Sequence, residues 1–267
     1  MPSDLELYKE KANELLGPAI LAGLDPAVVE IMKRNLDRIT LAGSRSSKTN
    51  SFNGDTVILV TLVIDESPSM GGLEYIVKKC YQDMLRALVE KVPYGDIQIS
   101  TWMFSGKRKL LNSFRPVNKA PRTIGMYDTS TGNGTALYDT VLSVLTSQVI
   151  LSHKIWGTDK MTRNVVILLS DGDDNISYKD QNGLQTKKLA QTLAEQGDYI
   201  LAYVGFGTNE PLSNDKCQYL ANKVGFNEII SVGKTEEEIV RIFRKFTSSI
   251  IQLSKSTEIE KIEGFLK

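Results

Sequence analysis

The stretch from Val57 to Ser69, with the sequence VILVTLVIDESPS, indicates the fold of this chain. Its first eight residues are almost continuously apolar, which predicts a strand that is buried on both faces. Such strands are typical of parallel sheets that helices cover on both sides. Acidic and hydroxyl residues follow at once, beginning with Asp65. The stretch therefore predicts a polar site at the carboxyl end of a buried strand.

From Asp55 onward, strand and helix patterns alternate along the chain. We predict strands at 57–64, 97–104, 108–114, 164–170, 199–206 and 228–232. We predict helices at 73–91, 135–149, 183–197, 213–224 and 235–252. This alternation indicates an α/β fold with a doubly wound, mainly parallel sheet, similar to a Rossmann fold. The three residues from Ser105 to Lys107 suit a hairpin, so we expect one antiparallel edge strand.

The chain divides into four parts by pattern. Residues 1–43 form a helical extension, in which Asp25-Pro26 begins a helix with an apolar stripe from Val28 to Ile39. Residues 44–54 are a polar linker, 55–252 the α/β domain, and 253–267 a tail with a weak helical stripe. We expect the extension to pack on the main domain, with a docking surface for a partner as the alternative.

Composition excludes several classes of protein. Acidic and basic residues number 32 each, so no excess of charge favours nucleic acid or an anionic membrane surface. Cys80 and Cys217 lack metal or redox spacing and are expected to be buried thiols. The chain has no signal-peptide pattern at its start and no apolar run near the ~20 residues that span a bilayer. We therefore expect a cytoplasmic protein.

Three fragments place oxygen-bearing side chains where predicted strands end or helices begin. Asp65–Ser69 follows the first strand, Gly134–Leu137 opens a helix, and Leu168–Gly172 ends a later strand. Ligands of an open parallel sheet bind beyond the carboxyl ends of its strands. Carboxylate and hydroxyl oxygens suit a hard cation such as Mg²⁺. We therefore expect the three fragments to form one divalent metal site.

These fragments resemble the motifs of the von Willebrand factor A (VWA) family. Asp65, Ser67 and Ser69 match its DxSxS signature, Thr135 matches its threonine, and Asp171 matches its later aspartate. The family calls this set the metal-ion-dependent adhesion site, or MIDAS. The resemblance implies that the three hydroxyls bind Mg²⁺ or Mn²⁺, and that the two carboxylates bind it directly or through water. It also implies that an Asp or Glu carboxylate of a protein partner completes the coordination shell.

The resemblance extends over about residues 55–252 and has one departure. Pro68 stands where the family often has glycine; it fixes its own φ and should extend the backbone of Ser67. As a hypothesis, Tyr127 and Asp128 line the rim of the metal site and contact the partner. Asp173 is expected to cap the next segment, as are Glu66 and Asp174, with an acidic rim as the alternative.

We expect a metal-dependent protein-binding module and not an enzyme. A phosphatase of the haloacid dehalogenase type requires a second aspartate where this chain has Ser67. A serine nucleophile requires a base, and the single histidine, His153, is expected in a loop after the helix at 135–149. The alternatives are a scaffold with a purely structural metal and a Mg²⁺-dependent phosphohydrolase. Resemblance to prokaryotic single-domain members implies a partner among AAA+ ATPases, or kinase and phosphatase modules, of stress and defence systems.

Overall fold

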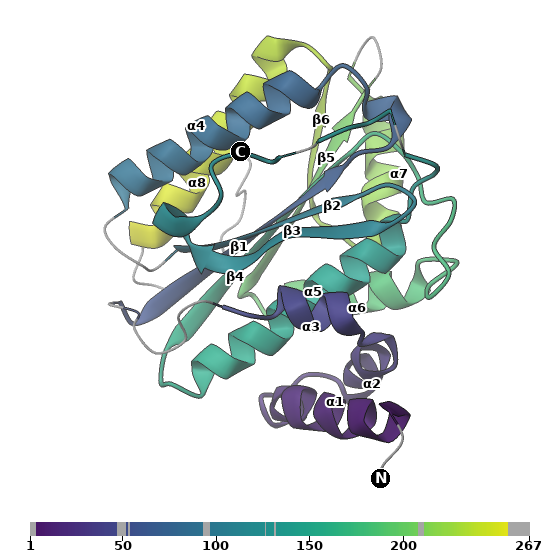
Figure 1. Ribbon diagram of the computed structural model, residues 1–267, viewed down its shortest axis with the longest axis vertical. Coiled ribbons are helices and arrows are strands. Elements are labelled where there is room, and N and C mark those ends of the chain that lie inside the picture. The colour runs from purple at the N-terminus through teal and green to yellow at the C-terminus, as the bar shows by residue number, and fades with distance from the viewer. Residues whose placement is uncertain are drawn as a thin grey trace.

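The computed structural model describes residues 4–46, 52, 54–92, 97–125, 127–130, 132–207 and 211–255. Its centre is a six-stranded sheet with the strand order β3-β2-β1-β4-β5-β6 (Figure 1). All neighbouring strands are parallel except β2 and β3, which pair antiparallel at one edge. The strands are β1 Thr56–Asp65, β2 Ile97–Phe104, β3 Arg108–Pro116, β4 Met161–Ser170, β5 Tyr199–Phe206 and β6 Glu228–Val232. The predicted fold class is confirmed.

Helices cover both faces of the sheet. On one face lie α4 and α8, and on the other α5, α6 and α7 (Figure 1). Their bounds are α4 Glu74–Lys91, α5 Leu137–Trp156, α6 Leu184–Glu195, α7 Asn214–Val224 and α8 Glu236–Lys255. Short 3₁₀ turns occur at η1 Pro68–Met70 and η2 Val117–Lys119. The expectation that His153 lies in a loop was wrong, because α5 continues to Trp156 and places it in the last turn.

The N-terminal extension forms three helices, α1 Asp4–Leu21, α2 Pro26–Asn35 and α3 Arg38–Gly43. They pack over α5, on its side away from the sheet (Figure 1). Every residue of α5 from Leu137 to Ser152 is therefore buried. Asp25 caps α2 as expected, accepting a hydrogen bond from Ala27 N. The apolar stripe after it is divided between α2 and α3, since the chain breaks at Leu36 and Asp37 starts a new helix.

Asp37 also joins the extension to the α/β domain. One of its carboxylate oxygens accepts from Thr40 N at the start of α3. The other accepts from Arg108 Nη2 (2.9 Å) and from Lys179 Nζ (2.6 Å). Burial alone raises the pKa of Asp37, but the hydrogen bonds from Lys179 and Thr40 outweigh burial and hold it at about 2. The extension is thus attached by an ion pair as well as by apolar packing.

Parts of the sequence predictions fall outside the described residues. These parts are 1–3 of the predicted extension, 47–51 and 53 of the predicted linker, 93–96, 126, 131 and 208–210 of the predicted α/β domain, and 256–267 of the predicted tail. No helix within the described ranges is long and apolar enough to cross a membrane. Cys80 and Cys217 are buried free thiols, as expected.

Candidate metal centre

The loop after β1 has the conformation that Pro68 predicts. Ser67 is extended, with φ −65° and ψ 156°, and Pro68 then begins the turn η1 at a position where a missing N–H costs nothing. The turn brings the next hydroxyl back toward the first, so Ser67 Oγ and Ser69 Oγ are 3.1 Å apart. A single short loop thereby directs two hydroxyl oxygens to the same place.

Hydrogen bonds connect these hydroxyls to carboxylates from two neighbouring strands. Asp65, at the end of β1, accepts from Ser67 N (2.8 Å) and from Ser170 Oγ (2.6 Å). Ser69 Oγ donates to Asp171 Oδ1 (2.7 Å) just beyond β4. Because β1 and β4 are adjacent in the sheet, their carboxyl ends meet at this edge. The structure therefore brings together four of the five residues of the predicted set.

The spacing of these oxygens suits a small hard cation. In an octahedral Mg²⁺ site with bonds near 2.1 Å, neighbouring oxygens lie about 2.9 Å apart. The separations of 3.1 Å between the Ser67 and Ser69 hydroxyls and 2.7 Å between Ser69 and Asp171 bracket that value. Within the described residues, no group of three or more His, Cys, Asp or Glu side chains could hold a metal ion. A metal at this edge would therefore depend on hydroxyl ligands.

Thr135 is attached through its backbone to the loop that follows Asp171. Thr135 N donates to Asn175 Oδ1 (2.8 Å), and Asn175 N donates to the carbonyl oxygen of Thr135 (3.1 Å). Gly134 before it has φ +96°, a conformation that favours glycine, and a side chain there would collide with Asn175 and Ile176. Asn175 belongs to the segment between β4 and α6 that begins with Asp171. Thr135 and Asp171 are thus fixed to the same loop.

Burial determines the electrostatics of Asp65, whose side chain is fully buried. Burial raises the pKa of Asp65 to about 6, against the lowering effect of hydrogen bonds from Ser170 and Ser67. The nearby charge of Asp171 raises it further. A buried carboxylate beside a second one is stabilised in its ionised form by a cation. The centre therefore has the charge as well as the oxygen spacing for a divalent metal.

The residues predicted for the rim take different positions. Tyr127 does not lie on the rim, because its side chain is 3% exposed. Its hydroxyl donates to the backbone carbonyl oxygen of Asp65 (2.9 Å) and so stabilises the loop after β1 from inside the domain. Asp128 is partly exposed and accepts from Ser130 N and Oγ. Asp173 accepts from Tyr138 OH (3.2 Å) and pairs with Lys223. Only the two aspartates remain available at the surface.

Other acidic residues in these loops have structural partners. Asp174 accepts from Ser177 N (3.0 Å) in the segment that follows it, which agrees with the expected capping role. It also accepts from Tyr138 N (3.0 Å) at the first turn of α5, which precedes it in the chain. Glu66 was expected to cap the next segment or to form part of an acidic rim, but its side chain is 1% exposed and pairs with Lys109 Nζ. Burial raises the pKa of Glu66, opposed by that lysine. Position in the sequence did not distinguish the buried Glu66 from the capping Asp174, because the direction of a side chain in a loop depends on the elements packed around it.

Sequence reasoning missed two residues that contact the centre. Ser170 was visible as a hydroxyl directly before Asp171, and its hydrogen bond holds Asp65. Lys234, in the segment between β6 and α8, donates to Asp171 Oδ2 (2.9 Å) and to the carbonyl oxygen of Ser69. The signal that could have identified Lys234 is its place just after a parallel strand, at the same edge of the sheet.

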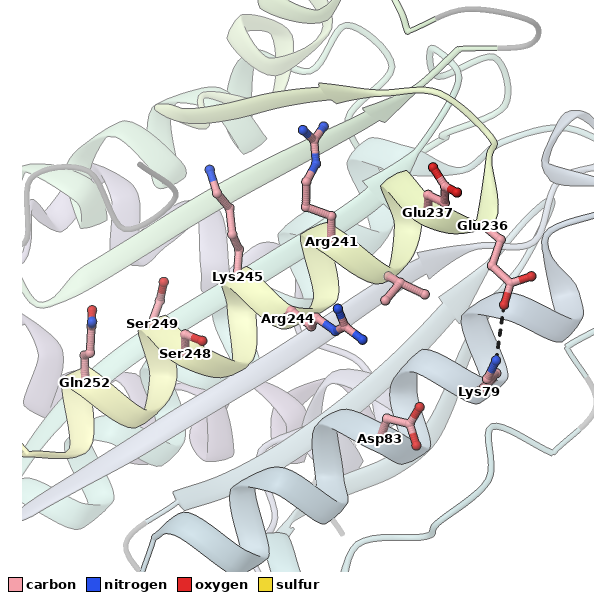
Figure 2. Close-up of a pocket in the computed structure, with 11 residues that line it drawn as sticks. Lys79, Asp83, Glu236, Glu237, Arg241, Arg244, Lys245, Ser248, Ser249 and Gln252 are labelled. Carbon is pink, nitrogen blue, oxygen red and sulfur yellow. Dashed lines mark hydrogen bonds and ion pairs between the residues drawn. The ribbon is translucent and has the colours of Figure 1, made fainter.

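Away from the candidate metal centre, a hollow of about 920 Å³ lies between α4 and α8 (Figure 2). Glu236 reaches across it to Lys79 on α4 (3.1 Å), while Arg241 and Lys245 point away from α4. Along α8 the lining begins with two glutamates, continues with the basic Arg241, Arg244 and Lys245, and ends with Ser248, Ser249 and Gln252, while α4 contributes Lys79 and Asp83. The mixture of charges gives this hollow no preference for an anion or a cation.

Comparison with known proteins identifies related folds only through structure. No protein-family model matches the chain, and no curated protein matches its sequence. Among solved structures, the PilB minor pilin from Streptococcus sanguinis matches with a TM-score of 0.52 and 16% identity, over 77% of this chain and 64% of that one. Proximal thread matrix protein 1 from the mussel byssus, with zinc in its MIDAS motif, matches with 0.51 and 16%, over 73% and 46%. The pilus adhesin SpaC from Lactobacillus rhamnosus GG matches with 0.53 and 11%, over 76% and 31%.

The chain spans between 31% and 64% of the length of these three proteins. At such identities the likeness concerns the fold alone. Together with the strand order and the one antiparallel edge strand, it shows that this chain shares the doubly wound α/β fold of these structures.

Proposed function

We propose that this protein is a divalent-metal-dependent protein-binding module. Ser67, Ser69 and Thr135 would hold Mg²⁺ or Mn²⁺ through their hydroxyls, and Asp65 and Asp171 would hold it directly or through water. When bound, the ion supplies an electrophilic centre with room for an outside oxygen ligand. An Asp or Glu carboxylate of a protein partner fills that position.

The observation that carries the proposal is the set of contacts from Asp65 through Ser67 and Ser69 to Asp171. Three of these four residues contribute oxygens at the spacing of an octahedral site. Neutral hydroxyls take little of the charge of a cation, so its attraction for an incoming carboxylate is preserved. The zinc-occupied MIDAS motif in the byssus protein supports the idea that this fold can hold a divalent ion.

The position of His153 supports a binding role over catalysis. It lies in the last turn of α5, a helix of 20 residues that spans about 30 Å, whereas Thr135 precedes the first turn. His153 packs edge-on against Trp156, and burial lowers its pKa to about 4. It is therefore not placed to activate Ser67 or Ser69 as a nucleophile.

We place this function in the cytoplasm, with a partner such as an AAA+ ATPase or a kinase and phosphatase module. The choice of these partner classes rests on resemblance alone. A minor pilin and a pilus adhesin among the structural neighbours favour a second setting, adhesion at the cell surface. In both settings the same carboxylate-to-metal contact joins the two proteins.

Metal titration of two matched variants tests the proposed metal centre. Asp65 ends β1 and Asp55 directly precedes it, so the same substitution can be made at both ends of one strand. Isothermal titration with Mg²⁺ and Mn²⁺ should show binding for the wild type and Asp55→Ala. We expect Asp65→Ala to bind about a hundredfold more weakly or not at all. Equal binding by all three proteins would contradict the proposed centre.

Affinity capture separates a partner-binding metal from a purely structural one. The wild type and Asp55→Ala should retain a partner from native lysate until EDTA is added, and Asp65→Ala should retain none. A structural metal predicts instead that EDTA lowers the melting temperature and leaves the captured proteins unchanged. Mg²⁺-dependent hydrolysis of a phosphoester panel by the wild type, lost in Asp65→Ala, would favour the phosphohydrolase alternative.

A further inference from the structure

Lys234 places a positive charge inside the candidate metal centre. It lies between β6 and α8, and its side chain is 13% exposed. Its ammonium donates to Asp171 Oδ2 (2.9 Å) and to the backbone carbonyl of Ser69. Within the part of the chain that the structure describes, it is the only basic side chain that pairs with Asp65 or Asp171. Lys234 is thus the internal counter-ion of the buried Asp171 carboxylate.

Lys234 and the proposed metal site use different oxygens of one carboxylate. Asp171 Oδ1 accepts from the Ser69 hydroxyl, while Oδ2 accepts from Lys234. A divalent cation held by Ser67, Ser69 and Asp171 would therefore share Asp171 with an ammonium group. Two cations on one largely buried carboxylate repel each other strongly, because little water screens them. Each weakens the binding of the other.

We infer that Lys234 is a built-in competitor of the divalent metal and sets the affinity of the site. This inference rests on the proposed function, since it concerns the same centre. Lys234 holds the loop that carries Ser69 and the loop that carries Asp171 together when no metal is bound. Metal binding must overcome this attachment, so the centre binds Mg²⁺ more weakly than its oxygen ligands alone would allow.

The sign of the effect follows from contacts that do not involve Lys234. Asp65 fixes the backbone of Ser67 and the hydroxyl of Ser170, and Ser69 bonds directly to Asp171. These contacts keep the oxygen ligands in place when the lysine is removed. Loss of Lys234 therefore removes a repulsive charge without dispersing the ligands, and metal affinity should rise.

The lysine also ties the segment before α8 to the metal centre. Two residues further on, Glu236 pairs with Lys79 of α4, but both side chains are about half exposed. Exposed ion pairs of this kind contribute little. The ion pair of Lys234 with Asp171 is better buried than the pair of Glu236 with Lys79. The contact of Lys234 with the centre therefore attaches the start of α8 as well as adding a positive charge.

The test compares Mg²⁺ affinity of the full chain in four proteins by isothermal titration: the wild type, Lys234→Met, Lys234→Arg and Lys223→Met. Lys223 is the matched control, because it pairs with Asp173 in the same loop without contacting a candidate ligand. We expect Lys234→Met to bind Mg²⁺ at least tenfold more tightly than the wild type. Lys234→Arg keeps the charge and should remain within threefold of the wild type, as should Lys223→Met.

Unchanged or weaker Mg²⁺ binding by Lys234→Met overturns the inference; weaker binding would make Lys234 a residue that positions Asp171. Thermal unfolding in EDTA verifies folding, and Lys234→Gln replaces the methionine variant if that variant does not fold. As a second readout, the rise in melting temperature on adding saturating Mg²⁺ should be larger for Lys234→Met than for the wild type. If Mg²⁺ binds the wild type but not Asp65→Ala, the proposed function stands even when the Lys234 result fails. Absence of Mg²⁺ binding in every variant overturns both.

Discussion

Two clusters of polar side chains lie toward opposite ends of the same parallel strands. The carboxyl-end cluster consists of Asp65, Ser67, Ser69, Asp171 and Lys234. The amino-end cluster consists of Gln148, Ser152, Thr162, Asn164 and Asp198. The first is built on loops that follow β1, β4 and β6. The second lies on the regular elements α5 and β4, apart from Asp198, which directly precedes β5.

The two clusters differ in how they use their hydrogen bonds. In the amino-end cluster, Gln148 accepts from Thr61 Oγ1 (2.8 Å) and donates to the carbonyl of Leu59 (3.0 Å) and to Asn164 (3.3 Å). These four groups are neutral and satisfy one another inside the core, which is what buried polar groups require. Asp198 is the one member of this cluster with an ionisable side chain. The carboxyl-end cluster instead collects charges and oxygens around one point. The amino-end cluster therefore stabilises the fold, whereas the carboxyl-end cluster is the one that we propose binds a ligand.

The largest effect should come from breaking the amino-end cluster. Gln148→Leu leaves Thr61 and Asn164 without their buried partner and should lower the free energy of unfolding by about 3 kcal/mol. Urea denaturation in EDTA measures this loss. Mg²⁺ affinity should not change, because the carboxyl-end cluster is intact. Gln191→Leu, at an exposed position of α6, is the control and should stay within about 0.5 kcal/mol of the wild type.

A smaller effect should come from the charge of Asp198. Burial raises its pKa to about 6, against hydrogen bonds from its own backbone and Asn164. The folded state therefore binds a proton more tightly than the unfolded state, and this group's contribution to stability falls as pH rises from about 4 to 6. Asp198→Asn should gain about 2 kcal/mol of unfolding free energy at pH 7.5, and the gain should vanish below pH 4.

Denaturation of the wild type and Asp198→Asn at a series of pH values isolates this contribution from those of other groups. Asp55→Asn, at an exposed position near the same end of the sheet, is the control. An equal gain in unfolding free energy at pH 4 and pH 7.5 would show that burial of the ionised Asp198 carboxylate does not destabilise the fold.

The smallest effect concerns the pH dependence of metal binding at the carboxyl-end cluster. Asp65, with a pKa of about 6 raised mainly by burial, must lose its proton before it can hold a metal. Mg²⁺ affinity should be constant above about pH 7 and fall about tenfold for each pH unit below 6. Titrations between pH 5 and 8 measure it. A flat profile would mean that Asp65 takes no part in binding.

Local patterns in the sequence were sufficient to predict most of the fold. The strands at 97–104, 199–206 and 228–232 have the predicted bounds. In the strand at 199–206, burial on both faces leaves an apolar run with clear ends. β4 begins three residues earlier than predicted, at Met161, because its polar first residues pair with the start of β1. α5 extends past residue 149 because Leu151 and Ile155 pack with Val57, Leu59 and Phe114 of the sheet, which no local pattern could indicate.

The candidate site was predictable in part. The DxSxS stretch and Pro68 predict the loop conformation that brings the hydroxyls of Ser67 and Ser69 together. The reason is local, because Pro68 fixes its own φ and favours an extended backbone at Ser67. The burial of Tyr127 and Glu66 was not predictable. Each belongs to a loop without periodicity, and its direction depends on the elements packed against it.

The sequence by itself determined which segments form strands and which oxygen-bearing side chains follow them, because both are properties of neighbouring residues. Only the tertiary structure decided which side chains meet. Lys234 is 63 positions from Asp171 and 165 from Ser69, and it reaches both because β6 ends at the same edge of the sheet as β1 and β4. Strand order and crossover paths determine that meeting, and they depend on the packing of the whole domain.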